Sequence, residues 1–143
     1  MQNIRLFIAI ELDDASKEFV TRLQRDLARA SSSANLTARQ NLHVTLAFLG
    51  ETDEARLPQV CASMDRIHAP AFRLSIARVG CFSRHGADLW WVGVDGGSAL
   101  RAIRTELAHH LEESRVWFDP KPFTPHLTIA REVRLKEERQ RPV

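Results

Sequence analysis

The chain has 143 residues, of which 44% are hydrophobic and 27% charged, and its formal net charge is +2. This length suits one domain with its own core, and the composition is that of an ordinary globular protein. The small charge permits an anionic ligand, but the sequence lacks the dense basic run typical of a strong nucleic-acid binder. Nothing at the N-terminus resembles a signal peptide and no apolar run reaches ~18 residues, so we expect a cytoplasmic protein that does not cross a membrane.

Strands and helices alternate along the chain. Apolar residues spaced three and four apart predict the helices, and alternation of apolar and polar residues predicts the strands. In chain order, we expect a strand at 4–11, a helix capped by Asp13 or Asp14 and ending near residue 30, a strand at 42–49, a helix at 54–67, strands at 72–82 and 89–94, a helix at 99–113 and a strand containing residues 126–129.

Turn residues separate these elements. The three serines at 31–33 indicate a loop, Gly50 is expected to end its strand, and the polar segment 83–88 predicts a hairpin. Cys61 and Cys81 lack metal-ligand spacing and are expected to be buried thiols, as in a reducing cytosol. The order is two rounds of strand, helix and strand, which predicts an α+β fold of two similar halves. Neither half could cover its core alone, so we expect residues 1–143 to form a single domain.

One short pattern occurs twice: residues 43–46 read HVTL and residues 126–129 read HLTI. Alternate side chains of a strand point to opposite faces. His43 and Thr45 therefore share one face of their strand, and His126 and Thr128 share one face of theirs, with the apolar residues turned to the core. Two imidazoles and two hydroxyls supplied in this way suit holding a phosphate and moving protons on both sides of it.

With these motifs the chain resembles the RNA 2′,3′-cyclic phosphodiesterases, also called 2′-5′ RNA ligases, of the 2H phosphoesterase superfamily, which is defined by two H-x-T-x motifs. The flanking segments are similar too, at residues 5–10, 41–50, 89–94 and 122–131. The resemblance implies two pseudo-symmetric lobes, each an antiparallel sheet with outer helices, around a V-shaped cleft. Family members usually continue with another strand, and without it a sheet edge beside the second motif would be exposed.

The resemblance also implies a reaction, the hydrolysis of RNA 2′,3′-cyclic phosphate ends to 2′-phosphates. By resemblance, His43 donates a proton and His126 accepts one, although the two motifs are too alike for the sequence to assign these roles. Thr45 and Thr128 would donate hydrogen bonds to phosphate oxygens. Arg131 could bind the phosphate, but strict alternation places it on the face opposite His126. No metal or other cofactor is expected, and the protein is expected to be a monomer.

Several alternatives stay open at this point. The substrate could be a small cyclic nucleotide or a 2′-5′ oligonucleotide, and the reverse reaction could join RNA ends through a 2′-5′ bond. A catalytically idle RNA-end binding module is a second class of function. A two-histidine metal site ranks last, because zinc sites usually have three or four protein ligands. Elsewhere, Trp90 and Trp91 point to opposite faces, one toward the core and one toward the cleft, and the remaining histidines are expected at the surface: His68, His85, His109 and His110.

Overall fold

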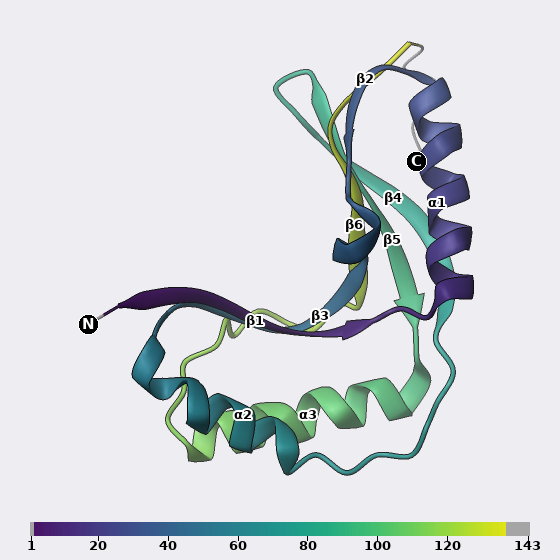
Figure 1. Cartoon of the computed structure of the whole chain (residues 1–143). Coiled ribbons are helices and arrows are strands. Elements are labelled where there is room, and N and C mark those ends of the chain that lie inside the picture. Colours follow the sequence, from purple (N-terminus) through teal and green to yellow (C-terminus); the bar gives the residue numbers. More distant parts are fainter. Residues whose placement is uncertain (1, 137–143) are drawn as a thin grey trace. The chain divides into compact units, whose positions relative to one another are not determined.

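The computed structural model describes residues 2–136. Figure 1 shows its helices and strands along the chain. In order they are β1 (Asn3–Glu11), α1 (Asp14–Arg29), β2 (Ser31–Leu36), the 3₁₀ helix η1 (Arg39–Asn41), β3 (His43–Asp53), the 3₁₀ helix η2 (Glu54–Arg56), α2 (Leu57–Asp65), β4 (Ser75–Arg84), β5 (Ala87–Asp95), α3 (Gly97–Glu113) and β6 (His126–Leu135).

The chain divides into two compact units, between which it passes several times. The first unit contains residues 2–9, 45–75 and 95–124, and the second contains residues 10–44, 76–94 and 125–136. Helices combine with two sheets, one of two strands and one of four. This confirms the mixed α+β class, whereas the cleft and the single-domain boundary stay predictions. Within residues 2–136, no helix is long and apolar enough to cross a membrane.

In the first unit, β1 and β3 form the two-stranded sheet, and α2 and α3 pack against each other. The predicted apolar stripe of α3 is buried, because its four members recur on one side of the helix. Gly50 does not end its strand as predicted. It takes a positive φ of 65°, which glycine adopts without steric cost, and β3 continues to Asp53. The buried stripe residues are Leu100, Ile103, Leu107 and Leu111.

The helix predicted at 54–67 forms in two pieces, η2 and α2, and Pro58 falls in the first turn of α2, where proline is tolerated. The apolar spacing in this segment predicts that residues 57, 60, 61, 64 and 67 face inward, and this prediction is partly wrong. Val60 is buried, but Cys61 and Met64 are exposed. A short helix that packs along one line of contact buries only the residues on that line, and the apolar pattern alone overestimates its width.

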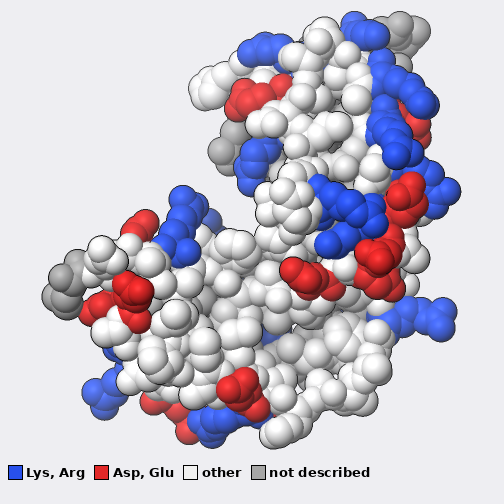
Figure 2. All heavy atoms as spheres, in the orientation of Figure 1, with Lys and Arg blue, Asp and Glu red and all other residues white. Residues whose placement is uncertain are grey.

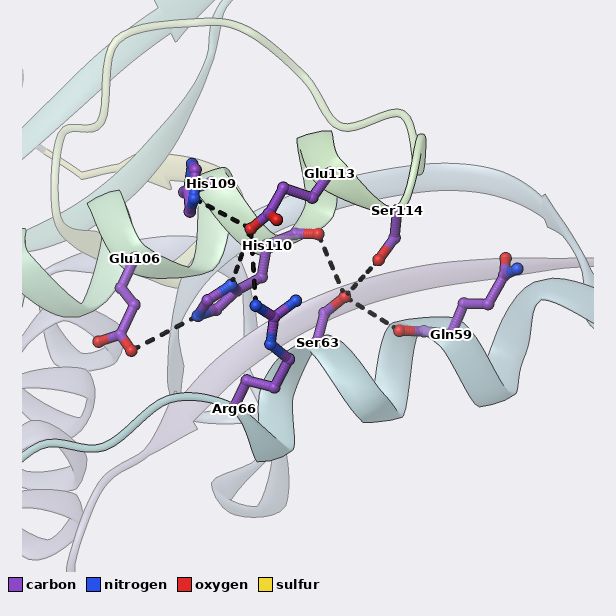
Figure 3. Close-up of polar contacts among 8 residues, drawn as sticks. All are labelled: Gln59, Ser63, Arg66, Glu106, His109, His110, Glu113 and Ser114. Carbon is purple, nitrogen blue, oxygen red and sulfur yellow. Dashed lines mark hydrogen bonds and ion pairs between the residues drawn. The ribbon is translucent and has the colours of Figure 1, made fainter.

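The prediction that all other histidines lie at the surface is wrong for His110, which is only 8% exposed. Figure 3 shows its ring between two carboxylates of α3, with Nε2 3.5 Å from Glu106 Oε1 and Nδ1 3.5 Å from Glu113 Oε1. His109 Nε2 lies 2.9 Å from the same Glu113 oxygen, and Arg66 of α2 lies 3.7 Å from it. Both ring nitrogens of His110 are buried without a hydrogen-bond partner among residues 2–136, so the two carboxylates lie at ion-pair distance only.

In the second unit, the four-stranded sheet has the order β2-β6-β5-β4, and α1 packs against it (Figure 1). As predicted, Asp13 caps α1, and its carboxylate accepts a hydrogen bond of 2.8 Å from the Ser16 amide. The predicted hairpin joins β4 and β5 through His85 and Gly86, whose φ values of 50° and 81° suit a tight hairpin turn. Cys81 of β4 is half-buried, so only part of the buried-thiol prediction holds.

The serines at 31–33 form strand β2 rather than the predicted loop. The strand pairs antiparallel with β6. Ser31 Oγ donates to the Leu27 carbonyl of α1 at 2.6 Å, and Ser32 Oγ donates to the Arg134 carbonyl of β6 at 3.1 Å. Serine is a weak strand former, so the pairing partner decides its conformation here. Because β2 lies on one side of β6 and β5 on the other, the strand of the second motif is internal in the sheet that residues 2–136 form.

Candidate active site

The second motif lies at the start of β6. The Val94 amide donates a 3.1 Å hydrogen bond to the Pro125 carbonyl, which fixes the chain just before the strand begins. Leu127 and Ile129 are buried, whereas His126 is exposed and Thr128 is half-buried. This alternation confirms the predicted division of the motif into a core face and an accessible face.

Two residues of β5 lie directly opposite the motif side chains. Gly93 pairs with His126, and Trp91 pairs with Thr128. Directly opposite residues of antiparallel strands project from the same face of a sheet. The Trp91 and His126 rings accordingly meet edge to face, with centroids 6.3 Å apart and planes at 72°. Trp90 points the other way and is buried, which confirms that one of the two tryptophans faces the core, whereas the cleft expected beside the other stays a prediction.

The first motif opens β3 with the same alternation. Leu42, Val44 and Leu46 are buried, His43 between them is half-buried, and Thr45 is exposed. The boundary of the two units falls inside this motif, so that His43 belongs with the second unit and Thr45 with the first. Both motif histidines are therefore part of the second unit.

The segment that leads to His43 is attached to the strand of the second motif. Thr37 Oγ1 donates to the Thr128 carbonyl at 2.9 Å, and the Thr37 amide donates to the Ile129 carbonyl at 2.9 Å. The Gln24 side-chain amide of α1 donates to the carbonyls of both Thr37 and Ile129, each at 2.9 Å. The chain then reaches His43 six residues after Thr37. One buried glutamine thus ties α1, the approach to the first motif and the second motif strand together.

An irregularity in β6 changes the side on which its later residues lie. Trp91 pairs with Thr128, but its neighbour Trp90 pairs with Ala130, a shift of one residue. Trp90 and Trp91 project from opposite faces, so Ala130 lies on the face of Trp90, where it is fully buried. The extra residue in β6 is a β-bulge, which reverses the alternation beyond it.

Arg131 follows this bulge. The pairs Leu36–Ala130 and Asn35–Arg131 with β2 are consecutive and without a shift, so the strand is regular at this step. Arg131 therefore projects from the face opposite Ala130, which is the face of His126, and it is exposed. The strict-alternation prediction for Arg131 is wrong, because it assumed a strand without a bulge.

Three further side chains gather on the same face, and the sequence indicated only one of them, Trp91. From β4, the Arg78 guanidinium carbon lies 5.3 Å from the centroid of the Trp91 ring, and the Phe82 centroid lies 5.9 Å from it. The sequence could have indicated Arg78 and Phe82 as well. Each lies two positions from Gly80, and residues an even number of positions apart in a strand project from the same face.

Charge on the second unit is distributed rather than concentrated. Along α1, basic and acidic side chains pair with one another: Arg25 with Glu18 at 3.9 Å, Arg29 with Asp26 at 3.4 Å, and Arg39 of η1 with Glu18 at 3.6 Å. Figure 2 shows the two signs interleaved on this face. Exposed pairs of this kind leave little net potential to attract a long polyanion.

The donor set of the motif face suits proton transfer and anion binding. Imidazole changes charge near neutral pH, hydroxyls donate to oxyanions, and a guanidinium can bind two phosphate oxygens at once. Among the residues that the structure describes, no three His, Cys, Asp or Glu side chains gather where they could hold a metal ion.

Comparison with known proteins assigns the chain to a family. The sequence model of the 2′-5′ RNA ligase superfamily matches residues 12–141. An RNA 2′,3′-cyclic phosphodiesterase of Thermotoga maritima is 30% identical over 131 residues, which are 90% of this chain and 70% of the relative. A protein of the same name from Geobacillus stearothermophilus is 29% identical over 134 residues, but the match spans only 43% of that relative's length.

The fold comparison agrees. The crystal structure of Escherichia coli LigT complexed with 3′-AMP has a TM-score of 0.75 and 26% sequence identity, and the match covers 99% of this chain and 78% of LigT. The fold and the resemblance drawn from the two H-x-T motifs are therefore confirmed. With a family match over most of its length and a 30% identical relative, this chain belongs to the 2′-5′ RNA ligase superfamily.

Proposed function

We propose that the chain hydrolyses RNA 2′,3′-cyclic phosphate ends to 2′-phosphomonoesters, acting as a monomer and without a metal or other cofactor. The observation that carries the proposal is the pair of H-x-T motifs, each at the start of a strand whose apolar residues are buried and whose histidine side chain remains accessible. The names of the Thermotoga and Geobacillus relatives support this substrate. LigT was crystallised with 3′-AMP, which, like the proposed RNA end, is a nucleotide that carries its phosphate on the ribose.

The proposed step is an in-line displacement at phosphorus. His126 takes a proton from water as the water oxygen bonds to phosphorus, and the bond from phosphorus to the ribose O3′ breaks. His43 gives its proton to O3′, which leaves as a hydroxyl, and the phosphate remains on O2′. One histidine must be neutral and the other protonated at the start, a division of labour that general acid–base catalysis requires.

The other three residues would act on the phosphate itself. Thr45 and Thr128 would donate hydrogen bonds to its non-bridging oxygens, on which charge grows in the pentacoordinate state. Arg131 would add a guanidinium on the same sheet face as His126 and Thr128. With a 5′-hydroxyl in place of water as the nucleophile, the same displacement at phosphorus would release O3′ and form a 2′-5′ linkage.

The charge distribution supports recognition of an end rather than of a long strand. The net charge is only +2, and the arginines of α1 and η1 are paired with carboxylates. A protein that tracks a polyanionic backbone would instead present unpaired basic groups. A small cyclic nucleotide or a 2′-5′ oligonucleotide offers the same reacting group, so these substrates are tested beside RNA.

The test is turnover of a short RNA that ends in a 2′,3′-cyclic phosphate, with product analysis to separate 2′- from 3′-phosphate. We expect a 2′-phosphate, formed equally well in EDTA. His43→Ala and His126→Ala should each lower kcat by ~10²-fold or more, the scale of a positioned acid or base. The double variant should lose much less than the product of both effects, because the two groups act as a unit.

His68→Ala is the matched control, since His68 is an exposed histidine outside both motifs, and it should keep full activity. Near wild-type turnover by either folded motif variant would refute the acid–base pair. Tight binding of the RNA end without turnover would instead identify a recognition module. Activity lost in EDTA and restored by a divalent metal would point to the metal site that we ranked last.

A further inference from the structure

Trp91 lies beside His126 on their common sheet face, and their rings are in edge-to-face contact. The opposite face of this sheet carries α1, whose Leu23 and Leu27 line a cavity together with Trp90 and Ile129. The face of Trp91 is therefore the side that α1 leaves uncovered. Trp91 itself is half-buried, and the neighbouring His126 is exposed.

The indole packs closely against Gly80 of β4 and lies beside Gly93 of its own strand. A Cβ atom at Gly80 would lie 2.2 Å from Trp91 Cζ2, and one at Gly93 would lie 3.5 Å from Trp91 Cζ3. The ring thus rests directly on the backbone of β4, where any other residue would displace it. An aromatic ring supported in this way is a preorganised surface, because little rotamer freedom remains to be lost when a ligand binds.

The surroundings of the indole are apolar on one side and cationic on the other. Phe82 is 57% exposed, although large apolar side chains are usually turned inward in globular proteins. Arg78 is exposed and lies over the Trp91 ring. Within residues 2–136, no carboxylate lies within ion-pair distance of Arg78. Its charge therefore remains available to an anion.

Resting on the proposed function, we propose that Trp91, flanked by Phe82 and Arg78, stacks on the nucleobase of the nucleoside that carries the reacting phosphate. Aromatic side chains bind bases of any sequence through their π-faces, and arginine adds a cation–π contribution. The base and the cyclic phosphate are attached to one ribose, so the base lies one sugar's width from the phosphorus. Because the rings of Trp91 and His126 meet edge to face, with centroids 6.3 Å apart, a base stacked on the indole would bring its cyclic phosphate beside the His126 imidazole.

The test compares two RNAs that differ only at the terminal ribose, which carries adenine and the cyclic phosphate in one and the cyclic phosphate without a base in the other. Trp91→Leu should raise KM for the adenine-bearing RNA by about 5- to 150-fold, the range for loss of one stacking aromatic. KM for the abasic RNA should change less than about twofold, and kcat should stay near wild type for both. Trp91→Phe, which keeps a ring, should give an intermediate KM.

Trp117→Leu is the matched control, because Trp117 is a 61% exposed tryptophan of the first unit, and it should leave both KM values unchanged. An equal rise in KM for both RNAs in Trp91→Leu, or no rise for either, would overturn the proposal. Circular dichroism and the thermal unfolding temperature identify a misfolded variant, in which case Trp91→Phe carries the kinetic test.

A binding measurement separates this proposal from the proposed reaction. Adenosine 2′-monophosphate should quench the tryptophan fluorescence of the wild type and of Trp117→Leu, and this quenching should disappear in Trp91→Leu. Quenching that depends on Trp91 without any turnover of cyclic phosphate would support the stacking surface and refute the hydrolase. Turnover with neither quenching nor dependence on the terminal base would support the hydrolase and refute the stacking surface.

Discussion

Gln24→Leu should destabilise the second unit through the approach to the first motif. Gln24 is 4% exposed, and its side-chain amide donates two hydrogen bonds of 2.9 Å, to the Thr37 and Ile129 carbonyls. Each such bond contributes about 0.5–1.5 kcal/mol net, so the loss of both should cost about 1–3 kcal/mol. The Ile129 carbonyl keeps the Thr37 amide as a donor, and leucine fills most of the volume of glutamine. The variant therefore does not leave both carbonyls without a donor, and it does not open a large cavity that would lower the free energy of unfolding further.

Urea denaturation of Gln24→Leu measures this loss, and Gln59→Leu, on the exposed face of α2, is the control that should stay within about 0.5 kcal/mol of wild type. Amide hydrogen exchange should in addition show faster exchange at Thr37, because the segment anchored by Gln24 opens more readily. A free energy of unfolding equal to that of the control, with unchanged exchange at Thr37, would refute the anchoring role that we assign to Gln24.

Three shorter predictions follow from the motifs and from the cap of α1. Thr45→Val and Thr128→Val keep side-chain shape but delete a donor, so each should cost ~2–4 kcal/mol of transition-state stabilisation. The loss should appear in kcat more than in KM, whereas the exposed Thr105→Val should be silent. The rate should rise and then fall with pH, because one motif histidine must be neutral and the other protonated, and a flat pH profile with rate-limiting chemistry would contradict shared acid–base work. The backbone and side chain of Ser16 hold the pKa of Asp13 below its ordinary value of 3.8. A lowered pKa contributes stability that is present above the ordinary value and lost as pH falls through the folded-state pKa. Asparagine at this position also caps a helix but does not titrate, so Asp13→Asn should lose less stability than wild type during acid unfolding below about pH 4. Identical unfolding curves against pH for the two proteins would refute the stabilising role of the ionised Asp13 carboxylate.

Much of this protein follows from local sequence. Asp13 at the N-cap, the apolar stripe of α3 and the turn at His85–Gly86 produce elements where predicted, because each depends on residues within a few positions of one another. The accessible positions of His43 and His126 follow from alternation in single strands. Family membership followed from the same two motifs, since the spacing of histidine and threonine in them is a local pattern too.

Only the tertiary structure decided the remaining features, because each depends on a partner distant in sequence. Residues 31–33 become a strand through pairing with β6, about 100 positions away, and their own serine composition favours a loop. Two carboxylates of α3 and the packing of α2 allow His110 to be buried. Arg131 reaches the face of His126 through a bulge, and a one-residue shift in pairing has no signature in the alternation of a single strand. The indole of Trp91 rests on Gly80 for the same reason: a residue of β5 meets a residue of β4 only once the sheet has formed.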